Sequence, residues 1–185
     1  DRLTAGCFSA CAVAAILLPA GCTPTTSTSS PVPSSPVSSV TPTPTPTPTP
    51  TYGPNQQAAI EVVTKYYAWM DRQLTAPGPI NGVALQALAE GPPFAAAVNS
   101  ASQAYSKSQR RTGTLRLASI VPEAESSTVI KIAVCTDSSD VVWLQQETPM
   151  PRPTNVPTRQ AYSYTAQNKA GNWILTESSG GMSSC

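Results

Sequence analysis

The chain of 185 residues contains no histidine, which limits the chemistry that its other side chains can perform. A Ser-His-Asp or Cys-His nucleophile and an imidazole-ligated metal are excluded, because each needs the imidazole ring. The carboxylates available as acid or base are Glu61, Asp71, Asp137 and Asp140. Glu61 and Asp71 are ten residues apart on an expected helix, about 80° short of whole turns, so they share no face. Asp137 and Asp140 flank two serines in an expected turn, where carboxylates usually accept hydrogen bonds from nearby backbone N–H groups. The sequence therefore predicts no catalytic residue, no metal site and no cofactor.

A different chemistry is expected near the N-terminus. Residues 3–18 are small or apolar and follow a single Arg2. Sixteen residues are fewer than the roughly 20 that span a bilayer as a helix, but this length is typical of the apolar core of an export signal. Residues 1–21 are therefore interpreted as a signal peptide.

The residues after this run, Leu18-Pro19-Ala20-Gly21-Cys22, resemble the lipobox of bacterial lipoproteins. In that motif an aliphatic residue and two small residues precede the cysteine that is lipidated and becomes the mature N-terminus. Ala20, Gly21 and Cys22 match, whereas Pro19 stands where the motif usually has Leu. The resemblance implies lipidation of Cys22, with diacylglyceryl and palmitate chains, and two or more acyl chains hold a protein stably in a membrane. The alternative is secretion of a soluble chain.

The next segment, residues 22–54, is expected to be a disordered linker. Positions 23–54 hold 10 prolines and 17 serines or threonines, and TPTPTPTPTPT occupies 41–51. Such a stretch has too little apolar surface to fold. Alternating proline favours polyproline II at ~3.1 Å per residue, which gives a reach of roughly 100 Å. The linker would hold a domain well away from the membrane.

The charge pattern excludes one class of partner. Lys and Arg total 11 and Asp and Glu total 10, for a net charge of +1, so no nucleic-acid footprint is present. Lys107, Arg110, Arg111 and Arg116 lie close together in sequence and are interpreted as the solvated end of a helix. Contact with an anionic wall polymer is the alternative.

The folded part, residues 55–185, is expected to begin with helices. Asn81 can cap a short helix, and a longer one is expected to start at Pro92 and end near Arg110. Before them, a helix is predicted over 56–74, because apolar residues recur there at spacings of three and four: Ile60, Val63, Tyr67, Met70 and Leu74.

After Gly113 the apolar period changes to two, which is typical of strands. Helices followed by an antiparallel meander predict an α+β domain whose single curved sheet wraps around the long first helix. Five strands are expected, at 114–121, 128–135, 141–145, 159–167 and 172–177.

Aromatic residues are the remaining candidates for binding. Tyr67 is expected in the core, and Trp69 at the sheet edge or exposed. Tyr162, Tyr164 and Trp173 lie on adjacent expected strands and are predicted to pack as a cross-strand cluster. The alternative is an open aromatic face for a sugar or a peptide.

Three short motifs carry a resemblance. They are the strand end Cys135-x-Asp137, the hairpin Gly171-x-Trp173 and the C-terminal Cys185. Together with the order of helices and strands they resemble exported bacterial proteins of the nuclear-transport-factor-2-like (NTF2-like), or cystatin-like cone, fold. The resemblance implies an α+β cone over about 56–185. It does not choose a function, since that superfamily includes isomerases, dehydratases, transport adaptors and non-catalytic accessory domains.

The cysteine count favours export. Cys7 and Cys11 would leave with the signal peptide and Cys22 would be lipidated, so Cys135 and Cys185 remain as an even pair in an oxidising compartment. A disulfide between them would close a loop of about 50 residues and pin the Gly- and Ser-rich tail.

These observations favour an envelope lipoprotein on the outer face of the cytoplasmic membrane, anchored by lipid. Its domain is expected to be non-catalytic and to bind an envelope protein or a cell-wall glycan. The alternative is a small-substrate enzyme of the isomerase or dehydratase type that uses carboxylate and tyrosine groups. The two differ inside the domain, because an enzyme needs a buried acid with a shifted pKa.

Overall fold

A computed structural model describes residues 51–185, except for the side chains of 124 and 125. The predicted signal peptide, Cys22 and most of the predicted linker lie outside the described residues. Of the helices described, none is both long enough and apolar enough to cross a bilayer.

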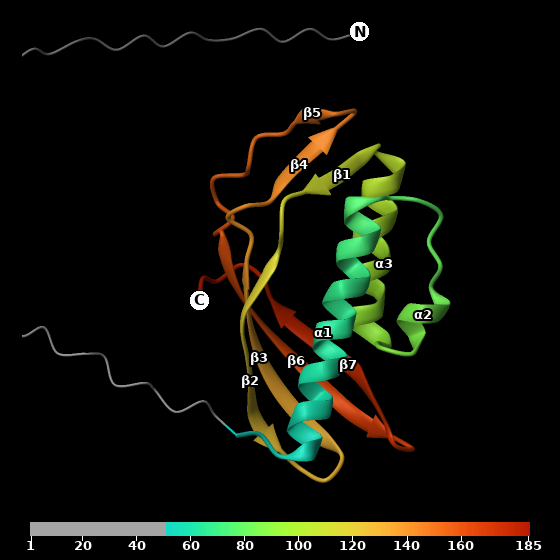
Figure 1. Cartoon of the computed structure of the whole chain (residues 1–185), viewed down its shortest axis with the longest axis vertical. Coiled ribbons are helices and arrows are strands. Elements are labelled where there is room, and N and C mark those ends of the chain that lie inside the picture. Colours follow the sequence, from blue (N-terminus) through green and yellow to red (C-terminus); the bar gives the residue numbers. More distant parts are fainter. Residues whose placement is uncertain (1–50) are drawn as a thin grey trace, which may run out of the picture. The chain divides into compact units, whose positions relative to one another are not determined.

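The long helix α1, Pro54–Thr75, agrees closely with the helix predicted over 56–74. Its start follows from Pro54 at the first helical position and from Gln56, whose side chain accepts a hydrogen bond from the Gly53 N–H at 2.9 Å. After it come the short α2, Val83–Gln86, and α3, Gly91–Ser106. Helices α1 and α3 lie side by side (Figure 1).

The strands form two antiparallel sheets. The main sheet has the order β2-β3-β6-β7, and the small sheet has the order β1-β4-β5. Their bounds are β1 Gln109–Thr112, β2 Arg116–Glu125, β3 Val129–Asp137, β4 Val142–Gln145, β5 Thr148–Pro149, β6 Arg159–Lys169 and β7 Asn172–Gly180.

The expected fold class, an NTF2-like cone with one curved sheet of five strands, is wrong. The described part is a mixed α/β fold in which strands dominate and are divided between two sheets. The strand predicted at 141–145 does not continue the meander, because β4 pairs with β1 instead. The chain then returns after residues 150–158, and β6 pairs with β3.

Strand β1 also corrects the predicted end of the third helix. Helix α3 stops at Ser106, four residues before Arg110. The chain turns at Lys107 and Ser108, and Ser108 has a positive φ of 50°. Arg110 and Arg111 therefore lie on β1, opposite Leu144 and Trp143 of β4, rather than at a solvated helix end.

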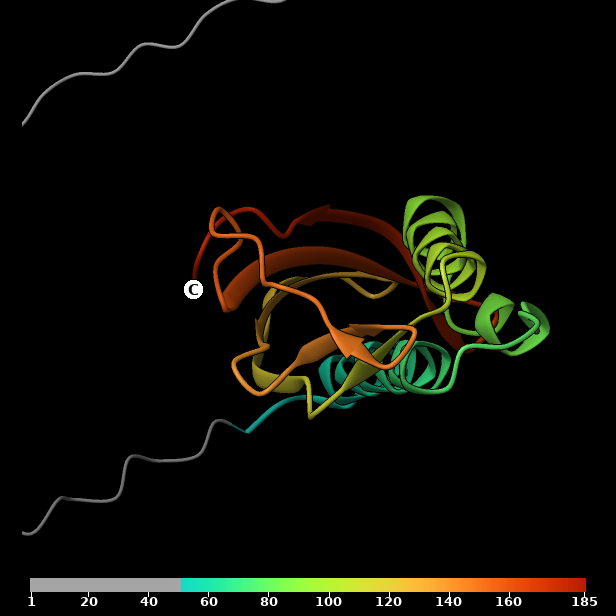
Figure 2. The same ribbon diagram turned by 90° about the horizontal axis from the view of Figure 1, so that it is seen from above.

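The core lies between the helices and one face of the main sheet, which is curved when seen from above (Figure 2). Strand residues two apart share a face, and Ile130, Ile132 and Val134 on β3 present their side chains to this core. Val62, Val63, Tyr66, Tyr67 and Trp69 fill it from α1. The prediction that Trp69 is at an edge or exposed is wrong, since its side chain is 3% exposed.

The C-terminal tail is held against β6 and β3. Cys135 and Cys185 are joined by a disulfide, with their Cα atoms 5.9 Å apart. The Gly181 N–H donates to the carbonyl of Ala161, and the Ala161 N–H donates to the carbonyl of Ser183. The predicted pair is thus bonded and fixes the tail.

Candidate functional site

Three tyrosine side chains lie together in the core between α1 and the main sheet. The rings of Tyr66, Tyr67 and Tyr164 meet edge to face, with centroids 5.7 to 6.1 Å apart. The hydroxyls of Tyr67 and Tyr164 are hydrogen-bonded at 2.9 Å, and the Tyr66 hydroxyl donates to the carbonyl of Pro93 at 2.9 Å. Each buried hydroxyl therefore has a partner within the domain.

These tyrosines have no acid–base role near neutral pH. Burial raises the pKa of Tyr66, Tyr67 and Tyr164 far above the usual tyrosine value. A general acid or base works best with a pKa near the operating pH. The tyrosines are accordingly packing groups of the core.

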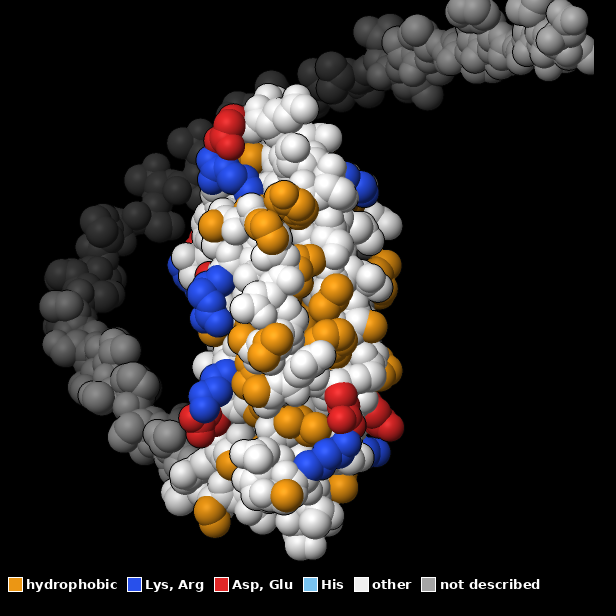
Figure 3. All heavy atoms as spheres, turned by 90° about the vertical axis from the view of Figure 1, so that its right-hand side faces the viewer, with side chains coloured by type: hydrophobic (Ala, Val, Ile, Leu, Met, Phe, Trp, Pro, Cys, Tyr) orange, Lys and Arg blue, Asp and Glu red, His pale blue; other side chains and the backbone are white. Residues whose placement is uncertain are grey.

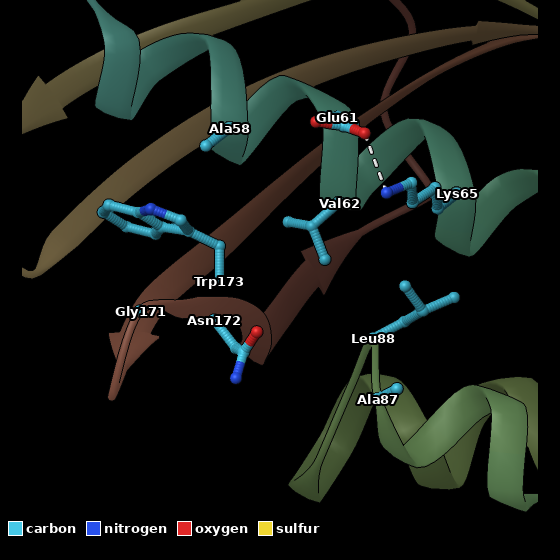
Figure 4. A pocket seen from close by; sticks show the side chains of 9 residues that line it. All are labelled: Ala58, Glu61, Val62, Lys65, Ala87, Leu88, Gly171, Asn172 and Trp173. Atoms are coloured by element: carbon cyan, nitrogen blue, oxygen red, sulfur yellow. Dashed lines mark ion pairs between the residues drawn. The ribbon is translucent and has the colours of Figure 1, made fainter.

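A groove lies beside this core, between α1 and the hairpin that joins β6 and β7 (Figure 4). Its cavity volume is about 290 Å³, at the small end of ligand-sized pockets. The residues that line it are Ala58, Glu61, Val62 and Lys65 from α1, Ala87 and Leu88 after α2, and Gly171, Asn172 and Trp173 from the hairpin.

The groove has an apolar floor and polar margins. Val62 belongs to the core cluster of buried side chains, and the partly buried Leu88 and Trp173 pack against that cluster. Glu61 and Lys65 form an ion pair at 2.7 Å, and both side chains are more than half exposed (Figure 4). The arrangement can hold a small amphipathic group by contact and hydrogen bonding.

A second groove of about 330 Å³ lies between α1 and the start of β2. Thr64, Tyr67, Asp71, Leu115 and Leu117 contribute to its lining. Its walls are largely apolar, and its one acidic side chain, Asp71, forms an ion pair with Arg111.

The four carboxylates considered from the sequence are not brought together. Asp71 pairs with Arg111, Asp140 pairs with Arg116 at 2.6 Å, and Glu61 lies in the first groove. The Ser139 N–H donates to Asp137 at 2.9 Å and lowers its pKa below the usual range, which agrees with the predicted turn.

The core between α1 and the main sheet also lacks an acidic side chain among those that the structure describes. Among the side chains that the structure describes, no Asp or Glu is buried. A hydrogen bond from Arg110 lowers the pKa of Glu147, which is exposed. Residues 51–185 contain no group of three Cys, Asp or Glu residues that can hold a metal ion.

The four neighbouring cations are mostly engaged rather than free. Arg110 donates to Glu147 at 2.8 Å and Arg116 pairs with Asp140, so both are neutralised locally. Arg111 is 4% exposed, and its guanidinium reaches Asp71 on α1. The interpretation as a solvated helix end is wrong for Arg111, because β1 carries it beneath α1.

The predicted aromatic cluster divides into two parts. Tyr162 and Tyr164 stack with centroids 6.3 Å apart, as expected for residues two apart on one strand. Trp173 instead pairs in register with Asn168, further along β6, and lines the groove. The sequence did not indicate that Lys65, Leu88 and Asn172 would join it there; the Gly171-x-Trp173 hairpin was the only signal.

The face formed by α2 and α3 carries apolar and uncharged polar side chains. Helix α3 has no charged residue, and Val83 and Tyr105 are 73% and 53% exposed. Figure 3 shows apolar side chains along the middle of this face and charged ones toward its margins.

No protein-family model matches the chain, and no curated protein matches it. Among solved structures, the chain is similar to the crystal structure of the intermembrane space region of the chloroplast protein ARC6. The two are 13% identical, the match covers 72% of this chain and 100% of that chain, and the TM-score is 0.49. A likeness at this level carries no conclusion about function.

Proposed function

We propose that the chain is a lipid-anchored protein of the bacterial cell envelope whose folded domain is a non-catalytic binding domain. Residues 1–21 are the export signal, Cys22 carries the lipid, and residues 22–54 hold the domain away from the outer face of the cytoplasmic membrane. The partner is a component of the envelope, met at the surface of the domain.

One observation carries the binding function: the interior is occupied by the domain's own side chains. Tyr66, Tyr67 and Tyr164 fill it with satisfied hydroxyls. An enzyme of the isomerase or dehydratase type needs an acid or a base beside its bound substrate. The described side chains place no Asp or Glu in that interior, so contacts with a partner belong on the surface and in the grooves.

Export and anchoring are supported by the sequence pattern around Cys22 and by the chemistry of the remaining cysteines. A disulfide between Cys135 and Cys185 persists in an oxidising compartment and not in a reducing cytosol. Burying two or more acyl chains, at ~0.8 kcal/mol per methylene, makes a stable anchor.

The test is metabolic labelling of the full chain in an exporting bacterium with a radioactive fatty acid. Wild type should incorporate label and sediment with membranes, whereas Cys22→Ala should be unlabelled. Pro19→Leu is the matched control, since it restores the usual lipobox residue and should label at least as well as wild type. Label that is absent from wild type, or equal in Cys22→Ala, would refute the anchor.

A further inference from the structure

We propose that the groove between α1 and the β6–β7 hairpin binds one pyranose ring of a neutral glycan. This inference rests on the proposed function, because it names the envelope component that the binding domain meets. Three properties of the groove favour a sugar as the ligand: one aromatic side chain, unpaired polar groups, and zero net charge.

The aromatic property belongs to Trp173. Its side chain is half-buried and packs against the core cluster, and Leu175, two residues on and on the same face of β7, is fully buried. Pairing of Trp173 with Asn168 on β6 fixes the backbone that carries the ring. A pyranose has faces made of C–H groups, which pack on the electron-rich face of an aromatic ring. A ring held in this way is a preformed platform for a sugar.

Polar groups stand beside this platform. The amide of Asn172 and the indole N–H of Trp173 make no hydrogen bond within the part of the chain that the structure describes, and Asn172 is exposed. Glu61 and Lys65 add a carboxylate and an ammonium on the opposite margin. Hydroxyls both donate and accept. A sugar can therefore satisfy the amide, the indole N–H and either partner of the ion pair.

The groove disfavours two other occupants. The edge of β7 that borders it is already paired by the chain itself: the Glu90 N–H donates to the Leu175 carbonyl, and the Leu175 N–H donates to the Leu88 carbonyl, both at 2.9 Å. A peptide cannot add there as an extra strand. The charges of Glu61 and Lys65 cancel, so an anionic polymer finds no positive site.

The experiment uses the full chain, purified in detergent, with two uncharged probes, chitotetraose and cellotetraose. Binding is followed by tryptophan fluorescence and by the NMR signals of the indole groups. The small contact of a single ring predicts a Kd on the order of 1 mM. Trp173→Ala should weaken binding by about tenfold or more, because it removes the stacking surface. Asn172→Ala, a change at an exposed position, should weaken it by about threefold while leaving the fold intact.

Trp143→Ala is the matched control, since Trp143 is also partly exposed but lies on β4, outside the groove. It should bind like wild type. The proposal is overturned if neither probe binds at about ten times the expected Kd, if Trp143→Ala loses binding as Trp173→Ala does, or if Asn172→Ala binds unchanged. Saturable binding of a neutral peptide in place of both probes also overturns it. None of these results touches fatty-acid labelling at Cys22, so the two proposals fail separately.

Discussion

The hydrogen bond between Tyr67 and Tyr164 allows the filled interior to be tested by a double-mutant cycle. The side chains are 7% and 5% exposed, and their hydroxyl oxygens are 2.9 Å apart. Removing one hydroxyl leaves the other buried without its partner, which costs about 1–3 kcal/mol. Removing both leaves two phenyl rings in contact and no orphaned group, which is close to neutral. Because the coupling energy is the double loss minus the two single losses, its magnitude should be about 2–6 kcal/mol.

The two single variants should differ. Tyr67 lines the second groove, so its hydroxyl can find a water molecule when Tyr164→Phe removes the partner. Tyr164 lines neither groove, so Tyr67→Phe should be the more destabilising change. Urea unfolding of wild type, both single variants and the double variant measures all four free energies of unfolding. Additive effects, with a coupling below about 0.5 kcal/mol, would refute a closed, hydrogen-bonded interior.

Three further predictions concern stability. The buried tyrosines keep their protons in the folded state, whereas the unfolded chain loses them above pH ~10. The free energy of unfolding should therefore be level below that pH and fall above it, by up to ~1.4 kcal/mol per pH unit for each tyrosine. A urea midpoint unchanged at high pH would contradict this. Replacing Cys135 and Cys185 by Ala opens a loop of 50 residues and should cost roughly 4 kcal/mol in urea unfolding, and a loss below ~1 kcal/mol would show that the bond adds little. Gly113→Ala places a Cβ 1.8 Å from the carbonyl oxygen of Asp140 at a φ of +76°, whereas Gly171→Ala, at a φ of +90°, meets nothing within 4 Å. Thermal unfolding should show the first to be the worse by about 2 kcal/mol or more, and equal effects would contradict the close approach.

The local elements could be predicted because their signals are local. The apolar spacing in 56–74 and the prolines beyond Thr75 fix α1 within two residues at each end. The strands predicted at 114–121, 128–135, 159–167 and 172–177 correspond to β2, β3, β6 and β7, since alternation depends on neighbouring residues alone. The disulfide is predicted because Cys135 and Cys185 are the two cysteines that remain once Cys7 and Cys11 are assigned to the signal peptide and Cys22 to lipidation.

The division into two sheets could not be predicted, because strand pairing depends on residues far apart in sequence. Gln109–Thr112 has four residues and two arginines, which is closer to a helix end than to a strand. What makes it a strand is pairing with Val142–Gln145, and burial of Arg111 depends on Asp71, 40 residues earlier. Neither contact leaves a periodic trace in the sequence.

Only part of the groove beside Trp173 could be predicted from the sequence. The sequence predicts a cluster of Trp173 with Tyr162 and Tyr164, because the three lie on adjacent expected strands. The observed register sets Trp173 opposite Asn168, beyond the tyrosines. Lys65 and Leu88 come to the same place only through packing of α1 and the α2–α3 connection against the hairpin.

Photo-crosslinking in an exporting bacterium tests most directly whether the domain binds an envelope component through its groove. A photoreactive phenylalanine derivative replaces Asn172 in the groove or, as a control, Val121 on β2, which is 44% exposed and outside both grooves. Position 172 should give a membrane-associated adduct that a glycan-cleaving hydrolase shortens, and position 121 should give no such adduct. Equal adducts from both positions, or none from position 172 in correctly folded protein, would contradict binding through the groove.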